Sequence, residues 1–219
     1  MSLAELKDSD DFFARARSRL SLNIPPALHD PTLAAIRGDL DTDPVQWEKA
    51  GVVASRPAAV LVGIVDRQEP TVLLTQRTGD LSNHAGQIAF PGGKIDPHDE
   101  TPLDAAVREA HEEVGLDRSQ IDPIGYLDLY LTFSGFRILP AVARIAPDYV
   151  MEINPKEVAD AFEVPLAFLM APGNHERHSR KTHGVVRQYY AMPYQERYIW
   201  GVTAGILRNL YEKLYQPRR

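Results

Sequence analysis

Hydrophobic positions along this chain fall into short runs separated by polar turns. Near-continuous apolar runs at 56–65 (RPAAVLVGIV) and 71–77 (TVLLTQR) predict two β-strands joined by the polar turn DRQEP. The first run is apolar enough to be a strand covered on both faces. Further strands are predicted at 124–131 (IGYLDLYL), 136–145 (FRILPAVARI), 187–194 (RQYYAMPY) and 197–200 (RYIW).

Helical periodicity marks other segments. Residues 9–20 predict a short amphipathic helix that begins at a serine or aspartate. Residues 201–215 predict a final helix with one apolar stripe, made of Val202, Ile206, Leu210 and Leu214. A short helix is predicted in 154–162 (NPKEVADAF), and residues 21–56, rich in proline and aspartate, are expected to wrap over the surface. This alternation of strands and helices predicts a single α+β domain.

The best-marked helix follows a glycine-containing loop. Thr101 can cap its N-terminus, Pro102 suits its first position, Asp104 stands three residues after the cap, and Gly115 supplies a stop. At about 100° per residue the helix has an apolar side that would anchor it to a sheet. That side is formed by Leu103, Val107, Ala110 and Val114.

Three glutamates share another face of this helix. Glu109, Glu112 and Glu113 would repel one another at this spacing, and they oppose the helix dipole near the C-terminal end. A solvated acidic surface is one interpretation. The other is a cation site, since hard oxygen ligands on one face suit Mg²⁺ or Mn²⁺.

Composition narrows the class of function. The chain has 219 residues and a net charge of −6, which argues against a general binder of nucleic acid or anionic membranes. With no cysteine, disulfides, zinc–thiolate sites, iron–sulfur clusters and thiol catalysis are excluded. No signal-peptide pattern is present and the longest apolar run, AAVLVGIV, is too short to span a bilayer, so a cytoplasmic location is expected.

The residues around the three glutamates resemble the Nudix box, G-x5-E-x7-R-E-U-x-E-E-x-G-U, where U is apolar. From Glu100 through Arg108 to Leu116 the spacing fits, with Ala110 at the first U. One departure lies upstream, because six residues rather than five separate Gly93 from Glu100. The loop KIDPHD therefore carries one extra residue, which leaves the helix register intact.

This resemblance implies a Nudix fold, an α/β/α sandwich around a mixed β-sheet, for residues 57–219, with residues 1–56 as an N-terminal helix and extension. It implies that Mg²⁺ or Mn²⁺ is held by the carboxylates of Glu109, Glu112 and Glu113 and by the Gly93 carbonyl. Arg108 and Glu100 are expected to brace the loop against the helix, with Glu100 also reaching metal through water.

Catalytic roles are expected for Glu112, Glu113 and Arg108, and the sequence leaves the general base open. Glu157, in NPKEVADAF, is a candidate for a distal base. The alternative for Glu157 is a helix N-terminal glutamate favoured by the dipole.

Residues 73–93, LLTQRTGDLSNHAGQIAFPGG, resemble the additional signature of the coenzyme A diphosphatase branch of the Nudix family. The matching residues are Leu73, Leu74, Thr75, Arg77, Gly86, Phe90, Pro91, Gly92 and Gly93. Two positions depart from the pattern: Thr78 replaces a serine or alanine, and Ser82 replaces an arginine. The resemblance covers about residues 57–210, and it predicts substrate contacts by Arg77, Gly86, Phe90 and Gly92.

The implied activity is metal-dependent hydrolysis of coenzyme A, or a derivative, to 3′,5′-ADP and 4′-phosphopantetheine. The alternatives are a Nudix hydrolase of ADP-ribose or another nucleoside diphosphate derivative, and a non-catalytic Nudix-like nucleotide-binding module. The expected partner is a small CoA-like nucleotide, with neither nucleic acid nor membrane. The oligomeric state stays open, with a homodimer as one option.

Overall fold

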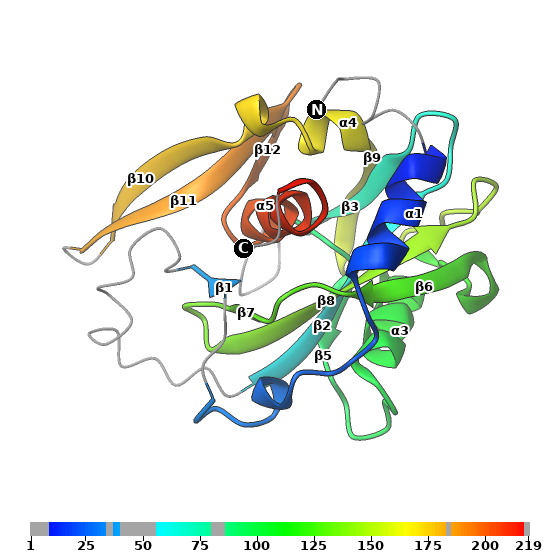
Figure 1. Cartoon of the computed structure of the whole chain (residues 1–219), viewed down its shortest axis with the longest axis horizontal. Coiled ribbons are helices and arrows are strands. Elements are labelled where there is room, and N and C mark those ends of the chain that lie inside the picture. The colour runs from blue at the N-terminus through cyan, green and yellow to red at the C-terminus, as the bar shows by residue number, and fades with distance from the viewer. Residues whose placement is uncertain (1–8, 34–36, 40–55, 80–85, 183–184, 217–219) are drawn as a thin grey trace.

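The computed structural model describes residues 9–33, 37–39, 56–79, 86–182 and 185–216, whose arrangement is shown in Figure 1. Two β-sheets and the helices around them make up this part of the chain. The larger sheet contains β1 (Arg37–Gly38), β2 (Arg56–Val65), β3 (Thr71–Arg77), β4 (Ile88–Ala89), β5 (Gly92–Lys94), β6 (Ile121–Tyr126), β7 (Tyr130–Leu131), β8 (Phe136–Ile145) and β9 (Val158–Pro165). The smaller sheet contains β10 (Glu176–Thr182), β11 (Val185–Tyr194) and β12 (Arg197–Trp200). The α-helices are α1 (Ser9–Arg19), α3 (Pro102–Val114), α4 (Leu166–Leu169) and α5 (Val202–Tyr215).

The larger sheet is mixed, as predicted. β2 and β8 run parallel through its centre, paired from Arg56 and Phe136 to Val65 and Ile145. β3 is antiparallel to β2, β4 and β9, and its pairing with β9 runs along its whole length. The strand order is β1-β7-β8-β2-β3-β4, with β5 beside β2, β6 beside β8 and β9 beside β3.

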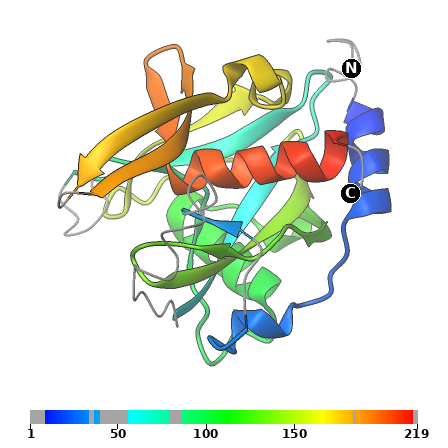
Figure 2. The same cartoon turned by 60° about the vertical axis from the view of Figure 1, so that its left-hand side comes forward.

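Alternate residues of the central strands pack into two cores, one on each face of the sheet. Leu73 of β3 belongs to the core under α3, and Leu74 belongs to the core under α1 and α5. Figures 1 and 2 show α3 on one side of the sheet and α5, with α1 packed at its end, on the other. The predicted α/β/α arrangement is therefore confirmed.

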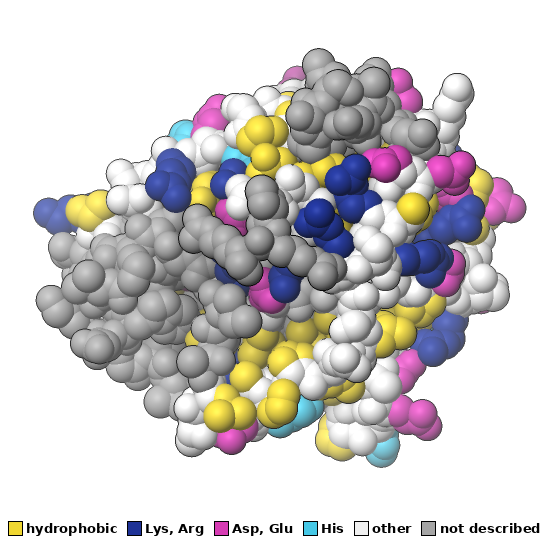
Figure 3. All heavy atoms as spheres, in the orientation of Figure 1, with side chains coloured by type: hydrophobic (Ala, Val, Ile, Leu, Met, Phe, Trp, Pro, Cys, Tyr) yellow, Lys and Arg dark blue, Asp and Glu magenta, His cyan; other side chains and the backbone are white. Residues whose placement is uncertain are grey.

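The smaller sheet extends this second layer. β11 and β12 contact α5, and β12 also contacts the short edge strand β4. Met192 of β11 and Ile199 of β12 are fully buried in the core beneath α5. In Figure 3 the face over α1 and α5 carries basic and acidic side chains side by side, and ion pairs such as Arg208–Glu212 at 2.7 Å link them.

The N-terminal helix is built into the same core. Phe12, Phe13 and Ala16 of α1 are buried in the cluster that contains α5. Further along, the buried Arg137 of β8 donates a hydrogen bond to the Leu33 carbonyl at 2.9 Å and another to the Ala27 carbonyl. These contacts tie the described part of the extension to the sheet.

Two predictions about strands and helices need correction. The segment 124–131 divides into β6 and β7, and the pairing of β6 with β8 shifts between Pro123 and Gly125. The helix predicted in 154–162 is wrong, because residues 155–157 form a turn and β9 follows at Val158. Pairing with β3 satisfies the backbone of this segment in the sheet and overrides its local helical preference.

The other predicted segments are confirmed as β2, β3, β8, β11, β12, α1 and α5. The sequence did not predict β1, β4, β5 and β10, and the short α4 falls within residues 163–169. Among the described helices, none has the length and hydropathy required to cross a bilayer.

Candidate functional site

The site begins with the helix α3, whose ends are set by local chemistry. The Thr101 side chain accepts a hydrogen bond from the Asp104 amide, and the Asp104 side chain bonds back to the Thr101 amide, forming a capping box. Gly115 ends the helix with φ 69°, a left-handed conformation that glycine adopts without strain. The predicted cap, first residue and stop are all confirmed.

A glycine pair brings β5 into contact with α3. A Cβ atom on Gly93 would lie 2.4 Å from Oε1 of Glu109, so any other residue there would displace the Glu109 carboxylate. Gly92 has φ 154°, and a Cβ there would lie 2.5 Å from the Ala59 carbonyl of β2. The structure thus places the backbone of Gly92 and Gly93 directly against the glutamate face of α3.

Glu113 is the buried member of this face. Its side chain is about as enclosed as the hydrophobic core, with the whole residue 2% exposed. Burial raises the pKa of its carboxyl to about 8, and the charges of Glu109 and Glu157 add to the increase. Two groups lower this pKa in part: the guanidinium of Arg77, whose Nη1 lies 3.9 Å from Oε1 of Glu113, and the backbone amide of Gly92.

The other two glutamates lie progressively closer to solvent. Burial raises the pKa of Glu109, although Nη1 of Arg108 donates a hydrogen bond to it at 3.0 Å. The side chain of Glu112 is 49% exposed, and its Oε1 lies 3.4 Å from the same nitrogen of Arg108. The face therefore grades from a buried carboxylate to an exposed one.

Arg108 braces the loop to the helix, but its main partner is not Glu100. Nε and Nη2 of Arg108 donate to the two carboxylate oxygens of Asp99, each at 3.0 Å, and Nη2 also reaches the Lys94 carbonyl at 3.1 Å. These hydrogen bonds from Arg108 hold the pKa of Asp99 below its usual range. Glu100 is exposed.

The extra loop residue explains this correction. Asp99 is separated from Gly93 by five residues, so it occupies the box position when the count starts at the glycine. Its Oδ2 accepts the Asp96 amide at 2.8 Å, which folds the loop back toward the helix. Placing the box position five residues after Gly93, instead of keeping it at Glu100, would have identified Asp99.

Glu157 approaches the site from the opposite side, in the turn before β9. The amides of Glu152 and Asn154 donate to the carbonyls of Val114 and Glu113, each at 2.9 Å, and so dock this segment on the C-terminus of α3. Burial is the main cause of the raised pKa of Glu109 and of Glu113, and the charge of the nearby Glu157 carboxylate adds to both. The alternative of a helix N-terminal glutamate is wrong, since no helix begins there.

Asn154 is a neighbour of Glu157 that sequence analysis missed. Its Nδ2 lies 3.5 Å from Oε1 of Glu157, and its backbone contacts Glu113. No motif marks this residue, because its position depends on how the turn docks on the helix.

The predicted substrate residues have different environments. Arg77 lies beside Glu113, and the Gly86 amide donates to the Arg77 carbonyl at 3.2 Å, which closes the loop at the end of β3. Phe90, however, is 3% exposed and packs in the core under α5, so its side chain has little surface to offer a substrate, and the predicted contact stays a prediction. Ser82 lies outside the described residues.

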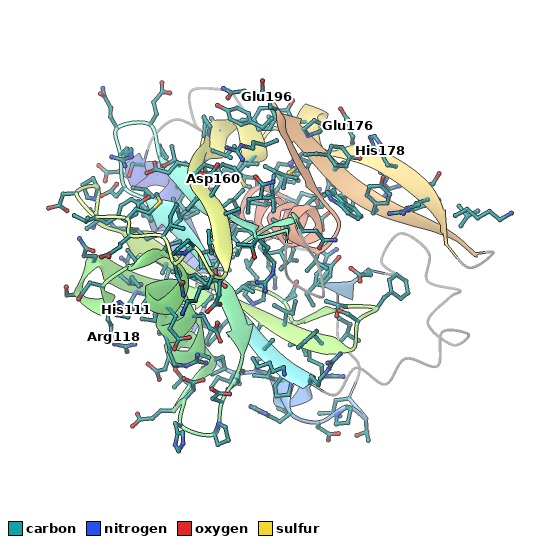
Figure 4. The ribbon with its side chains drawn as sticks, turned by 180° about the vertical axis from the view of Figure 1, so that it is seen from behind. His111, Arg118, Asp160, Glu176, His178 and Glu196 are labelled. Atoms are coloured by element: carbon teal, nitrogen blue, oxygen red, sulfur yellow. The ribbon has the colours of Figure 1, made fainter. Side chains whose placement is uncertain are left out.

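The carboxylate and carbonyl oxygens of this site are the ligand types that a hard divalent cation prefers. Their present positions, however, do not form a complete coordination site. Among the described residues, no three His, Cys, Asp or Glu side chains converge as a metal site. Glu109, Glu113 and the Gly93 backbone nevertheless lie together. The pKa values of both glutamates are raised first by burial and then by neighbouring negative charge, and a cation would favour their charged forms against both effects. Glu112 would become a third carboxylate ligand if its side chain rotated away from Arg108. Figure 4 shows this side of the molecule, with His111 marking the exposed face of α3 and Asp160 marking β9.

Comparison with known proteins assigns this arrangement to a family. Residues 54–183 match the NUDIX domain. A relative from Yersinia enterocolitica, named uncharacterized Nudix hydrolase NudL, is 40% identical over 160 residues, covering 73% of this chain and 82% of the relative. Its namesake from Cronobacter sakazakii is 42% identical over 155 residues, covering 71% and 81%. A crystal structure of DR0079 from Deinococcus radiodurans is similar with a TM-score of 0.48 and 15% identity, covering 72% of this chain and 84% of that one.

Because Arg108 binds Asp99 rather than Glu100, substitutions at these two positions form a matched pair of variants. Asp99→Asn removes the charge that Arg108 holds, and we expect it to lower the free energy of unfolding by about 1–3 kcal/mol. Glu100→Gln should change it by less than about 0.5 kcal/mol, because Glu100 is exposed. Urea unfolding of both variants measures the difference. A loss in Glu100→Gln that equals or exceeds the loss in Asp99→Asn would contradict the assignment.

The raised pKa of Glu113 predicts how stability depends on pH. Between the usual glutamate value of 4.5 and about 8, folded protein keeps a proton that unfolded chain releases, so stability falls as pH rises. In EDTA, wild type should lose on the order of 5 kcal/mol relative to Glu113→Gln across this range, because each unit of pKa shift corresponds to about 1.4 kcal/mol. Thermal unfolding of both proteins at several pH values measures this difference. The contributions of titrating groups that the two proteins share cancel in the comparison. Parallel stability curves would show that the pKa is not raised.

Proposed function

The chain belongs to the Nudix hydrolase family, and we propose that it hydrolyses the diphosphate bond of coenzyme A or a derivative to 3′,5′-ADP and 4′-phosphopantetheine. One contact carries the proposal: Nη1 of Arg77 lies 3.9 Å from Oε1 of Glu113. Arg77 belongs to the segment that resembles the coenzyme A diphosphatase signature, and Glu113 belongs to the Nudix box. The substrate motif and the box therefore meet at one place, which supports a common role.

The proposed cofactor is Mg²⁺ or Mn²⁺, held by Glu109, Glu112, Glu113 and the Gly93 carbonyl. When bound, such an ion neutralises charge on diphosphate oxygens and lowers the pKa of a coordinated water. Carboxylate and carbonyl oxygens are the ligands that both ions prefer. An acidic protein can in this way accept an anionic substrate.

The protein's own groups supply orientation and proton transfer. Arg77 is 30% exposed in its side chain and presents a guanidinium that suits a phosphate oxygen pair. Glu157 faces the glutamate pair from outside the box, where a carboxylate can take a proton from attacking water. Arg108 acts indirectly, because its bonds to Asp99 and Lys94 hold the glycine loop against α3.

A substrate panel with Glu113→Gln tests the proposal. We expect wild type with Mg²⁺ to convert coenzyme A to the two stated products faster than ADP-ribose, measured by chromatography. Glu113→Gln should lose about a hundredfold or more in kcat, as expected for loss of an electrostatic contact to the transition state. Glu69→Gln is the matched control, because Glu69 is exposed and precedes β3, whereas Arg77 ends it. Near-normal turnover by Glu113→Gln, or faster cleavage of ADP-ribose than of coenzyme A, would contradict the proposal.

Glu157→Gln tests the assignment of the base. If Glu157 accepts the proton from water, the variant should lose about a hundredfold or more in kcat/KM. The acidic limb of its pH–rate profile should also disappear, because the variant has no carboxylate at this position to accept the proton. A variant that keeps both its rate and its acidic limb would exclude Glu157 as the base.

A further inference from the structure

A cavity lies on the opposite face of β3 from the glutamate cluster. It has a volume of about 380 Å³ and opens between the end of β3, the strand β4 and the β11–β12 hairpin. Its lining includes Gln76 and Ile88 from the larger sheet, and Glu196, Arg197, Tyr198 and Trp200 from the hairpin. In Figure 4, Glu196 and Asp160 mark the hairpin and β9 beside it.

Aromatic rings of the smaller sheet form one wall of this cavity. Tyr198 and Trp200 alternate along β12 with the buried Ile199, so their rings lie on the face turned away from the core. The two ring centroids are 6.4 Å apart with an interplanar angle of 31°, and Tyr189 of β11 packs 5.3 Å from Trp200. Cross-strand pairs of this kind stabilise a sheet. Tyr198 is nevertheless 41% exposed, which leaves ring surface open toward a ligand.

The charges around the cavity disfavour a phosphate group. Nη1 of Arg197 donates to Oε1 of Gln76 at 2.8 Å, its Nη2 pairs with Asp160, and its guanidinium stacks 4.3 Å from the Phe162 ring. The positive charge is therefore already neutralised. Glu196 adds a negative charge at the rim, and no hydrogen bond or ion pair joins its carboxylate to the described residues.

The backbone of the hairpin turn presents this carboxylate to the cavity. Gln195 has φ 52°, and among the described residues it is the sole non-glycine with positive φ. Tight hairpin turns require this conformation, but glycine or asparagine normally adopts it. Gln195 and Glu196 form this two-residue turn, and Glu196 belongs to the lining of the cavity.

Two consecutive residues connect the cavity with the glutamate cluster. Side chains alternate along a strand, so Gln76 faces the cavity while Arg77 faces Glu113 on the other side of β3. A ligand with an aromatic end and a diphosphate end could pass over the end of β3 and occupy both places. Nucleotides have this shape.

We propose that the cavity binds the base of the nucleotide substrate, with the ring stacked on Trp200 and Tyr198 and an exocyclic amino group donating to Glu196. The link to substrate rests on the proposed hydrolase function. The preference for a planar, amino-bearing base follows from the cavity itself and is testable without turnover.

Fluorescence of Trp200 provides the direct test. The chain has two tryptophans, so Trp47→Phe leaves Trp200 as the single reporter in the full-length protein. AMP should change its emission saturably, whereas ribose 5-phosphate, which lacks a base, should not. Purine riboside 5′-monophosphate, which lacks the amino group, should bind about tenfold more weakly than AMP. Glu196→Gln should remove most of that difference.

Three results would overturn the proposal: no response to AMP, an equal response to ribose 5-phosphate, or discrimination between the two purines that is unchanged in Glu196→Gln. Kinetics add a second measurement. Trp200→Leu should raise KM for an adenine nucleotide substrate about tenfold with little change in kcat, and Trp200→Phe should restore KM. An unchanged KM in Trp200→Leu contradicts the proposal. If wild type cleaves no diphosphate, the proposed function fails, and the fluorescence titration still decides whether the base binds.

Discussion

The structure depends on keeping one carboxylate, that of Glu113, out of water while two other carboxylates face it. Burial disfavours its charge, and Glu109 and Glu157 add repulsion, so its pKa rises to about 8. A fold gains no stability from such a group. The cost is consistent with a site kept for chemistry, where raised pKa values are common. A divalent cation would change the balance, because it attracts the same charges that repel one another in its absence.

Each surrounding element holds this arrangement in place. The capping box and the apolar stripe fix α3 on the sheet, and the glycine pair of β5 lets the backbone approach Glu109. The bidentate ion pair between Arg108 and Asp99 holds the loop against the helix. The segment before β9 covers the C-terminus of α3 and places Glu157 beside the site. The described residues that form the site thus come from one helix, two strand ends and one docked turn.

Local signals explain why so much of this was predictable from sequence. Thr101, Pro102 and Gly115 determine the limits of α3 through contacts within a few residues, and the helical spacing of the glutamates follows directly. Interactions between distant segments were not predictable. Glu157 was placed in a helix because NPKEVADAF has helical character, but pairing with β3 draws this segment into the sheet. Asp99 was missed because the mismatch in spacing was attributed to an extra loop residue and the box position was kept at Glu100. The burial of Phe90 was not predictable, because a motif does not reveal burial.

Proton release on metal binding tests the central claim most directly. Calorimetric titration of Mg²⁺ near neutral pH, in two buffers with different ionisation enthalpies, gives the number of protons released. If Glu113 holds a proton in the metal-free protein and becomes a ligand, binding must release protons, and Glu113→Gln must abolish the release. Binding without proton release, or equal release from wild type and Glu113→Gln, would contradict the account.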